Sequence, residues 1–219
     1  MAQLFSPRAN FHSRMILAAI VVLICGAGWV TSEVFWSPYT TYVGIPFKQP
    51  VPFSHQHHVA GLGIDCRYCH TGVETSSFAG VPPTETCMTC HSQLWTEAPL
   101  LEPVRASMVN NRPLKWTRVH DLPDFVYFNH SIHVSKGVGC STCHGQVDQM
   151  PLTWKTETLY MRWCIDCHQA PQKYLRPRDQ VYNMSWKAPA NQESLGQKLA
   201  EQNHVDLSGR LINCSTCHR

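Results

Sequence analysis

The stretch Cys140-Ser-Thr-Cys143-His144 decides how this chain folds, because the pattern Cys-x-x-Cys-His occurs five times along it. The copies take up ten of the eleven cysteines and lie at residues 66–70, 87–91, 140–144, 164–168 and 214–218. Eleven cysteines in 219 residues are far above ordinary usage, so a covalent role must explain them. The length allows one or two domains.

Cys-x-x-Cys-His is the attachment signature of a c-type haem. Two thiols three positions apart reach the two vinyl groups on one edge of the porphyrin, and the following His ligates the iron on its proximal side. Zinc knuckles and vicinal disulfides are the alternatives, but zinc sites combine Cys pairs, and five units cannot pair off. We therefore predict five haem c groups, attached at Cys66, Cys69, Cys87, Cys90, Cys140, Cys143, Cys164, Cys167, Cys214 and Cys217. The predicted proximal ligands are His70, His91, His144, His168 and His218.

An internal repeat supplies candidates for the sixth, distal ligands. Val51-Pro-Phe-Ser-His55-Gln-His-His58-Val and Val126-Tyr-Phe-Asn-His130-Ser-Ile-His133-Val are offset by 75 residues, and each precedes a haem motif. Histidines three apart on a helical turn share a face but diverge, so one pair can ligate two different haems. The repeat therefore predicts His55, His58, His130 and His133 as distal ligands. His57 aligns with an isoleucine in the other copy and is predicted not to ligate.

The repeat provides four distal ligands for five haems, so the remaining distal ligand is less clearly indicated. His120, in Trp116-Thr-Arg-Val-His-Asp-Leu-Pro123, is the predicted residue. His204, Met150 and Met161 are the alternatives, and an axial Met would raise the potential of that haem. A haem with two protein ligands has no open position for a substrate. We therefore predict electron transfer at these sites and no catalytic residue.

The N-terminal segment indicates a membrane anchor. Residues 15–30 form an unbroken apolar run, and with residues 31–36 the stretch reaches 22 residues, about 33 Å as a helix and enough to span a bilayer. Arg8 and Arg14 precede it, which predicts a cytoplasmic N-terminus and an extracytoplasmic, periplasmic haem region. The alternative is a cleaved signal peptide, because the apolar core is short and contains small residues near Cys25. We favour a retained, single-pass anchor in a bacterial inner membrane.

The expected fold is mostly α-helical with long loops, a multihaem cytochrome c built around stacked haems with one N-terminal transmembrane helix. The predicted segments are a cytoplasmic N-terminus (1–14), the anchor (15–36), an extended Pro-rich linker (37–52), two two-haem modules (53–119 and 120–190) and a C-terminal segment with the fifth haem (191–219). Short helices should carry the motifs. A longer helix is expected at residues 194–202, where Ser194-Leu-Gly-Gln197 has the form of a capping box.

Charge and composition exclude some classes of function. The formal net charge is +3, and the basic residues form no stripe of the kind that nucleic-acid-binding proteins show. Aromatic and apolar residues are too plentiful for a disordered chain.

The residues from Arg118 to His133, the stretch Gly137-Val-Gly-Cys140-Ser-Thr-Cys-His-Gly145 and the stretch Tyr160-Met-Arg-Trp-Cys164-Ile-Asp-Cys-His168 closely resemble the membrane-anchored pentahaem cytochrome c subunit of alternative complex III. The resemblance covers nearly the whole chain. More generally, the repeat resembles the class III multihaem cytochromes, in which both His of the pair serve as distal ligands to separate haems.

The resemblance implies a subunit of a quinol:electron-acceptor oxidoreductase in respiration or photosynthesis. Its implied partners are integral-membrane subunits that oxidise quinol, an iron–sulfur subunit, and a monohaem cytochrome c or a terminal oxidase as acceptor. The alternative is a self-contained, membrane-anchored quinol dehydrogenase of the nitrate/nitrite reductase type. A third class, a multihaem enzyme, would require a haem with an open coordination position.

Overall fold

The computed structural model describes residues 6 and 8–218. The chain divides into two compact units, Met1–Tyr42 and Val43–Arg219, and we call the second the motif-bearing unit. Part of the predicted cytoplasmic segment, residues 1–5 and 7, lies outside the described residues, as does residue 219 of the predicted C-terminal segment.

The first unit contains one long helix, α1 (Ala9–Trp36). Its 28 residues correspond to about 42 Å, and it begins six residues before the predicted span. None of its side chains is buried, and the helix is long and apolar enough to cross a membrane. Length and composition suit both the predicted anchor and the alternative of a signal sequence.

The segment predicted as an extended linker begins with a helical turn. Helix α2 (Pro38–Thr41) starts at a proline, whose fixed φ suits the first helical position. The helix is followed by its capping residue Tyr42, which has a left-handed backbone conformation with φ of 56°. The prediction of an extended chain therefore fails for these residues, because a proline at a helix start favours the helix that it would break further inside.

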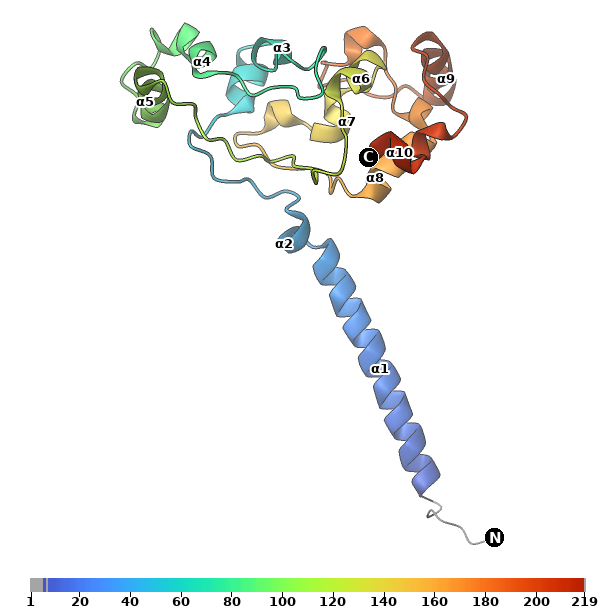
Figure 1. Ribbon diagram of the computed structural model, residues 1–219. Coiled ribbons are helices and arrows are strands. Elements are labelled where there is room, and N and C mark those ends of the chain that lie inside the picture. Colours follow the sequence, from blue (N-terminus) through green and yellow to red (C-terminus); the bar gives the residue numbers. More distant parts are fainter. Residues whose placement is uncertain (1–5, 7, 219) are drawn as a thin grey trace. The chain divides into compact units, whose positions relative to one another are not determined.

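The motif-bearing unit consists of short helices joined by long loops (Figure 1). Its α-helices are α3 (Cys66–Cys69), α4 (Thr84–His91), α5 (Glu102–Asn110), α6 (His130–Ser135), α7 (Cys140–His144), α8 (Met161–Gln169), α9 (Gln192–Gln202) and α10 (Cys214–Cys217). A π-helical turn and five 3₁₀ turns complete it: η1 (Gln56–Gly61), η2 (Pro99–Leu101), η3 (Val147–Gln149), η4 (Pro171–Lys173), η5 (Arg178–Gln180) and η6 (Arg210–Ile212). The described residues form isolated β-bridges and no strand, so the predicted mostly helical class is confirmed.

The apolar core of the motif-bearing unit is small. One cluster contains Leu175, Leu199 and Ala200, where α9 packs against η4. Gly196 allows this approach, because a Cβ there would overlap the backbone oxygen of Gln172. The sparse core agrees with the expectation that bound haems provide much of the interior.

Helix α9 confirms the predicted C-terminal helix with a different start. It begins at Gln192 rather than Ser194. The Ser194 hydroxyl donates to the carbonyl oxygen of Asn191 at 3.0 Å, so the predicted capping box does not form.

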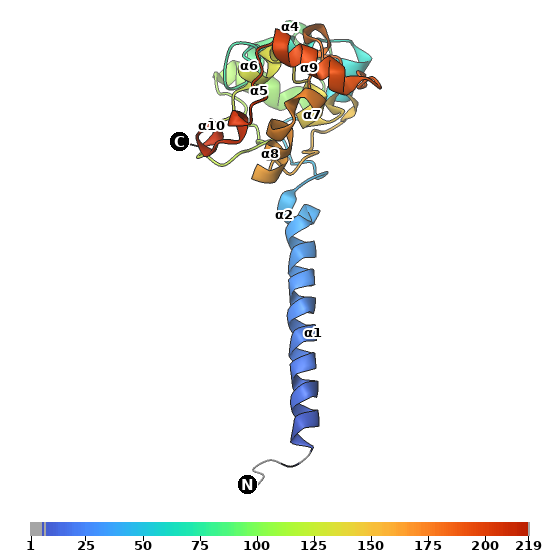
Figure 2. The ribbon, with the colours of Figure 1, turned by 90° about the vertical axis from the view of Figure 1, so that its right-hand side faces the viewer.

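The motif helices follow one another along the length of this unit (Figure 1). Helices α4 and α5 lie at one end, α3 follows, α7 is central, and α8 and α10 lie towards the other end. Figure 2 views the same row from the end near α9 and α10.

Candidate functional site

Each Cys-x-x-Cys-His motif lies on a short helix, as predicted. The five helices are α3, α4, α7, α8 and α10. A helical turn brings two residues three positions apart onto one face, so both thiols of a motif point to the same side. At α3 the Asp65 carboxylate caps the turn by accepting from the backbone N–H of Arg67 at 2.8 Å.

The predicted proximal histidines are oriented by hydrogen bonds to backbone carbonyls. Their Nδ1 atoms contact these oxygens in four of the five motifs: His70 with Gly80 (2.7 Å), His91 with Leu94 (3.2 Å), His168 with Leu211 (3.0 Å) and His218 with Phe125 (3.3 Å). A carbonyl can only accept, so Nδ1 carries the proton and Nε2 keeps a free lone pair. This is how metal-ligating histidines are usually held.

The four histidines of the repeat are held in the same way. His55 begins the turn that continues as η1, whereas His130 and His133 lie on α6. In all four histidines, including His58, the Nδ1 atom contacts an oxygen. The contacts are His55 with Thr153 Oγ1 (3.0 Å), His58 with the Ser54 carbonyl (2.8 Å), His130 with the Ser77 carbonyl (3.0 Å) and His133 with the Asn129 carbonyl (2.7 Å). Nδ1 donates to a carbonyl in His58, His130 and His133, whereas at His55 either Nδ1 or the Thr153 hydroxyl can be the donor. In each of the four, Nδ1 is engaged and Nε2 is the nitrogen left for a metal.

Each repeat histidine faces one motif histidine at nearly the same separation. The ring centroids lie 6.4 Å apart in His55–His70, 6.2 Å in His58–His91, 6.4 Å in His130–His144 and 6.2 Å in His133–His168. A metal–imidazole bond is about 2.0–2.1 Å and the ring centre lies roughly 1.1 Å further back, so two imidazoles on opposite sides of one metal have centroids about 6.3 Å apart. Four gaps in the structure therefore have the width that an iron with two axial imidazoles requires.

Burial keeps several of these imidazoles neutral, which is the form that binds a metal. Desolvation, reinforced by neighbouring imidazoles, lowers the pKa of His55 to about 4 and that of His144 to about 3. Burial also raises the pKa of the Cys143 thiol to about 12 and that of Cys140 to about 11.

The fifth motif differs from the other four. The ring of His218 lies 5.8 Å from that of Phe125 at an angle of 30°, and no second imidazole faces it among residues 8–218. His120, predicted as the remaining distal ligand without assignment to a particular motif, does not lie beside His218. Its ring centroid is 4.3 Å from that of His144, too close for the two imidazoles to lie on opposite sides of one iron. The structure therefore does not bring His120 to His218.

The surroundings of His120 are those of a buried imidazole. Its Nε2 is buried without a hydrogen-bond partner, and burial lowers its pKa to about 4. Together with His130, it encloses the ring of His144.

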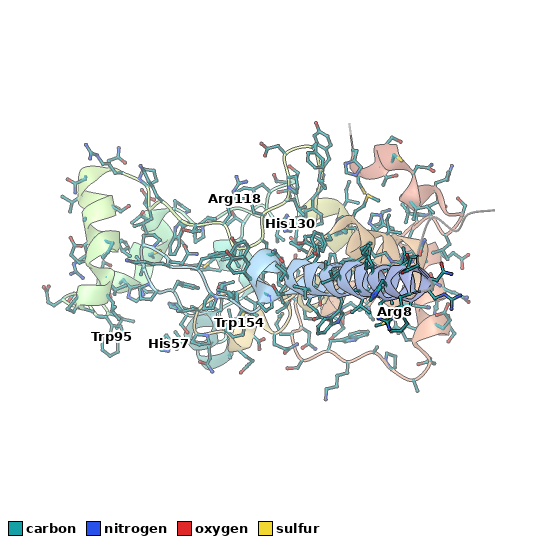
Figure 3. All side chains as sticks on the ribbon, turned by 90° about the horizontal axis from the view of Figure 1, so that it is seen from below. Arg8, His57, Trp95, Arg118, His130 and Trp154 are labelled. Atoms are coloured by element: carbon teal, nitrogen blue, oxygen red, sulfur yellow. The ribbon has the colours of Figure 1, made fainter. Side chains whose placement is uncertain are left out.

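The remaining candidates are dispersed. His57 and His204 are exposed, and Figure 3 shows His57 at the edge of the unit, whereas His130 is more central. Met150 is 2% exposed and its carbonyl accepts from the backbone N–H of Gln56 at 3.1 Å. Met161 is 64% exposed. The prediction that His57 does not ligate agrees with this exposure.

Arg176 is a buried cation beside the third motif that sequence reasoning did not single out from the other basic residues. Its Nη2 donates to Ser141 Oγ at 3.0 Å and Thr142 Oγ1 at 3.2 Å, the two side chains between the motif cysteines. The guanidinium lies 4.6 Å from the ring centre of Trp186 and is 4% exposed. A Cβ at Gly139 would overlap the guanidinium. The glycine before Cys140 is therefore the sequence feature that could have indicated a side chain packed closely against this motif.

Comparisons with known proteins agree with this geometry. Residues 132–219 match the model of a family described as cytochrome c3. The chain is also 28% identical, over 201 residues, to the menaquinone reductase multiheme cytochrome c subunit of Nitratidesulfovibrio vulgaris. That match covers 91% of this chain and 87% of the relative. With the five motifs, these similarities indicate a multihaem cytochrome that binds haem c covalently.

Proposed function

We propose that this protein is the pentahaem electron-transfer subunit of a membrane quinol:electron-acceptor oxidoreductase. The observation that carries the proposal is the set of four imidazole pairs with centroids 6.2–6.4 Å apart. A site closed by two imidazoles has no position for a substrate, so it can relay electrons but cannot activate a bound molecule.

The proposed ligands follow the geometry. The ten motif cysteines hold five haems, and the motif histidines are their proximal ligands. His55, His58, His130 and His133 are the distal ligands of the first, second, third and fourth motifs respectively. His120 is not carried into the proposal, because its ring packs against His144. The fifth distal position is left unassigned among His204, Met150, Met161 and a group from a partner.

Haem c supplies reversible one-electron chemistry at iron, and the protein side chains fix each imidazole and exclude other ligands. Quinol oxidation releases two electrons and two protons, so it also needs groups that accept protons. Between Met15 and Val30 the sequence offers no ionisable side chain except Cys25. We therefore place the quinol site in integral-membrane partner subunits, with an iron–sulfur partner subunit also in the route. The proposed acceptor is a monohaem cytochrome c or a terminal oxidase.

Helix α1 supports a membrane location for this subunit. Arg8 and Arg14 on its N-terminal side support a cytoplasmic N-terminus. The motif-bearing unit then lies in the periplasm of a bacterial cell, where an oxidising compartment handles paired thiols.

The relative's name raises a second candidate for the direction of electron flow. It is described as part of a menaquinone reductase, which would take electrons from a donor and reduce quinone. A closed haem relay operates in both directions, so the same ligand geometry serves either reaction. The potentials of donor and acceptor determine the direction.

The test is quinol-driven haem reduction in detergent, measured by absorbance on the isolated chain and on the complex that co-purifies under gentle solubilisation. The proposal expects rapid reduction of the complex and none of the isolated chain. Reduction of both at a similar rate would overturn it in favour of the self-contained quinol dehydrogenase. Quinone-driven oxidation of the prereduced complex, compared under the same conditions, separates the two directions.

A further inference from the structure

We infer that the five attachment motifs form a single line in the order second, first, third, fourth, fifth, and that electrons are exchanged with partner proteins at its two ends, the second and fifth motifs. The inference rests on the proposed function in that each motif carries a haem. It adds a route, which motif numbering along the chain does not give.

The second and first motifs are joined directly. The hydroxyl of Tyr68, between the cysteines of the first motif, is 2.8 Å from Oγ1 of Thr89, between those of the second. His55 and His58, which face these two motifs, lie on one helical turn. The two metal sites therefore share a single distal segment.

The first and third motifs are joined by reciprocal contacts. His130, which faces the third motif, donates from Nδ1 to the carbonyl of Ser77, in the loop after the first motif (3.0 Å). His55, which faces the first motif, contacts Oγ1 of Thr153, in the loop after the third (3.0 Å). Each of the two sites thus has its distal imidazole oriented by the loop of the other, which requires that they be neighbours.

The fourth motif follows the third, and the fifth follows the fourth. His130 and His133 share α6 and face the third and fourth motifs. His168 of the fourth motif donates to the carbonyl of Leu211, in η6, at 3.0 Å. Turn η6 packs against α8 and leads into Cys214 of the fifth motif.

Together these contacts give the first, third and fourth motifs two neighbouring motifs each. The second and fifth motifs have one neighbour each, as the ends of a line must.

The exposure of the motif cysteines and the arrangement of the motif helices also place the second and fifth motifs at the two ends of the line. Of the ten motif cysteines, the exposed ones are Cys90 of the second motif and Cys214 of the fifth. Helices α4, α3, α7, α8 and α10 follow one another from left to right in Figure 1, and the second and fifth motifs lie at opposite sides of Figure 3 as well. One electron leaves a one-electron donor at one end and reaches a one-electron acceptor at the other, with no bond formed or broken. Donor and acceptor can therefore dock at the same time.

The order can be tested with a photosensitiser attached to the haem-loaded full chain. Leu94→Cys and Phe125→Cys provide matched attachment points in a Cys25→Ser background. Both side chains are exposed. The carbonyl of Leu94 orients His91 of the second motif, and the carbonyl of Phe125 orients His218 of the fifth motif, so each label lies beside one end of the line. A light flash then injects one electron at the chosen end without any quinol, so the outcome is independent of the proposed quinol reaction.

The arrival of the electron is followed at single haems tagged by His55→Met, His130→Met or His133→Met. A Met ligand raises the potential and changes the absorption spectrum of the haem that it binds. From Leu94, the half-times should lengthen in the order first, third, fourth motif, and from Phe125 the order should reverse. An unchanged sequence of half-times from both labels, or arrival at the third motif before the first from Leu94, would overturn the inference.

A second measurement covers the case in which a tagged variant does not assemble. Iron positions located by anomalous scattering at the iron edge in crystals of the unmodified haem-loaded protein give the order directly. The inference expects the iron of the first motif between those of the second and third. The inference is refuted if the iron of the third motif has the iron of the second or fifth motif, and not that of the first, as its nearest neighbour besides the iron of the fourth.

Discussion

Arg176→Met removes a buried positive charge beside the third motif while keeping a side chain of similar length. In the native protein the guanidinium donates to Ser141 and Thr142, and also to the carbonyl of Asn183 at 3.2 Å. Its Nε is buried without a partner, and burial lowers the pKa of the group. The variant should therefore affect both the stability of the fold and the potential of the third haem.

The two effects have different magnitudes. Three hydrogen bonds from a charged donor would be worth about 1.5–3 kcal/mol each if counted singly, but removing the buried charge also recovers several kcal/mol of desolvation. We expect a net loss of about 2–3 kcal/mol in the free energy of unfolding, or roughly 4–12 °C in Tm for a domain of this size. For an assumed separation of about 10 Å between this charge and the iron, an effective dielectric constant of 20 gives about 1.7 kcal/mol, roughly 70 mV for one electron. The midpoint potential of the third haem should fall by tens of millivolts, because the lost cation opposed the ferric state.

Thermal unfolding and a spectroelectrochemical titration of the haem-loaded protein measure the two effects. Arg176→Lys should lose stability but keep most of the potential, since it retains the charge. Arg162→Met is the exposed control: its side chain is 80% accessible and paired with Asp166, and it should change stability by less than about 0.5 kcal/mol. Midpoint potentials that stay constant in Arg176→Met while Tm falls would refute the electrostatic part of the reasoning.

Three further outcomes are expected. His58→Ala should convert one haem to the high-spin state, whereas His57→Ala should leave the absorption and EPR spectra unchanged; equal spectra from both variants would contradict the assignment. His120→Phe should keep every haem at its native spin state, because His120 packs against a ligand without being one, and a new high-spin signal would restore it as a ligand. Gly196→Ala should destabilise the motif-bearing unit by about 3 kcal/mol in denaturant unfolding, because the new Cβ overlaps backbone. Gly61→Ala, whose Cβ would meet its nearest atom at 3.6 Å, should change stability much less.

The parts of the site that were predictable from the sequence are those set by local spacing. Attachment of a porphyrin edge requires two thiols one helical turn apart and an adjacent imidazole. The five motifs therefore predict haem attachment without any information on tertiary structure. The His-x-x-His repeat is equally local, because divergence of two imidazoles follows from helical geometry. The structure places all four of these histidines opposite motif histidines.

The location of His120 and the burial of Arg176 could not be predicted from the sequence, because both depend on contacts between distant segments. His120 was selected because a fifth distal ligand was needed, but counting residues does not show which imidazole a side chain approaches. Its neighbour is His144, 24 residues along the chain, and not His218. Arg176 was not singled out for the same reason: one Arg among 18 Lys and Arg residues carries no specific signal until its burial is known.

The duplicated pattern predicts two two-haem modules, and the hydrogen bonds between them mean that neither is complete alone. If the modules were split, His130 would lose the carbonyl of Ser77 and His55 would lose the hydroxyl of Thr153. Each would then keep its imidazole but lose the contact that fixes which nitrogen faces the metal. These contacts join the first and third motifs. The contacts that unite the two copies of the repeat therefore also form the second of the four steps in the proposed line. Continuity of the relay and cooperativity of the fold therefore depend on the same residues.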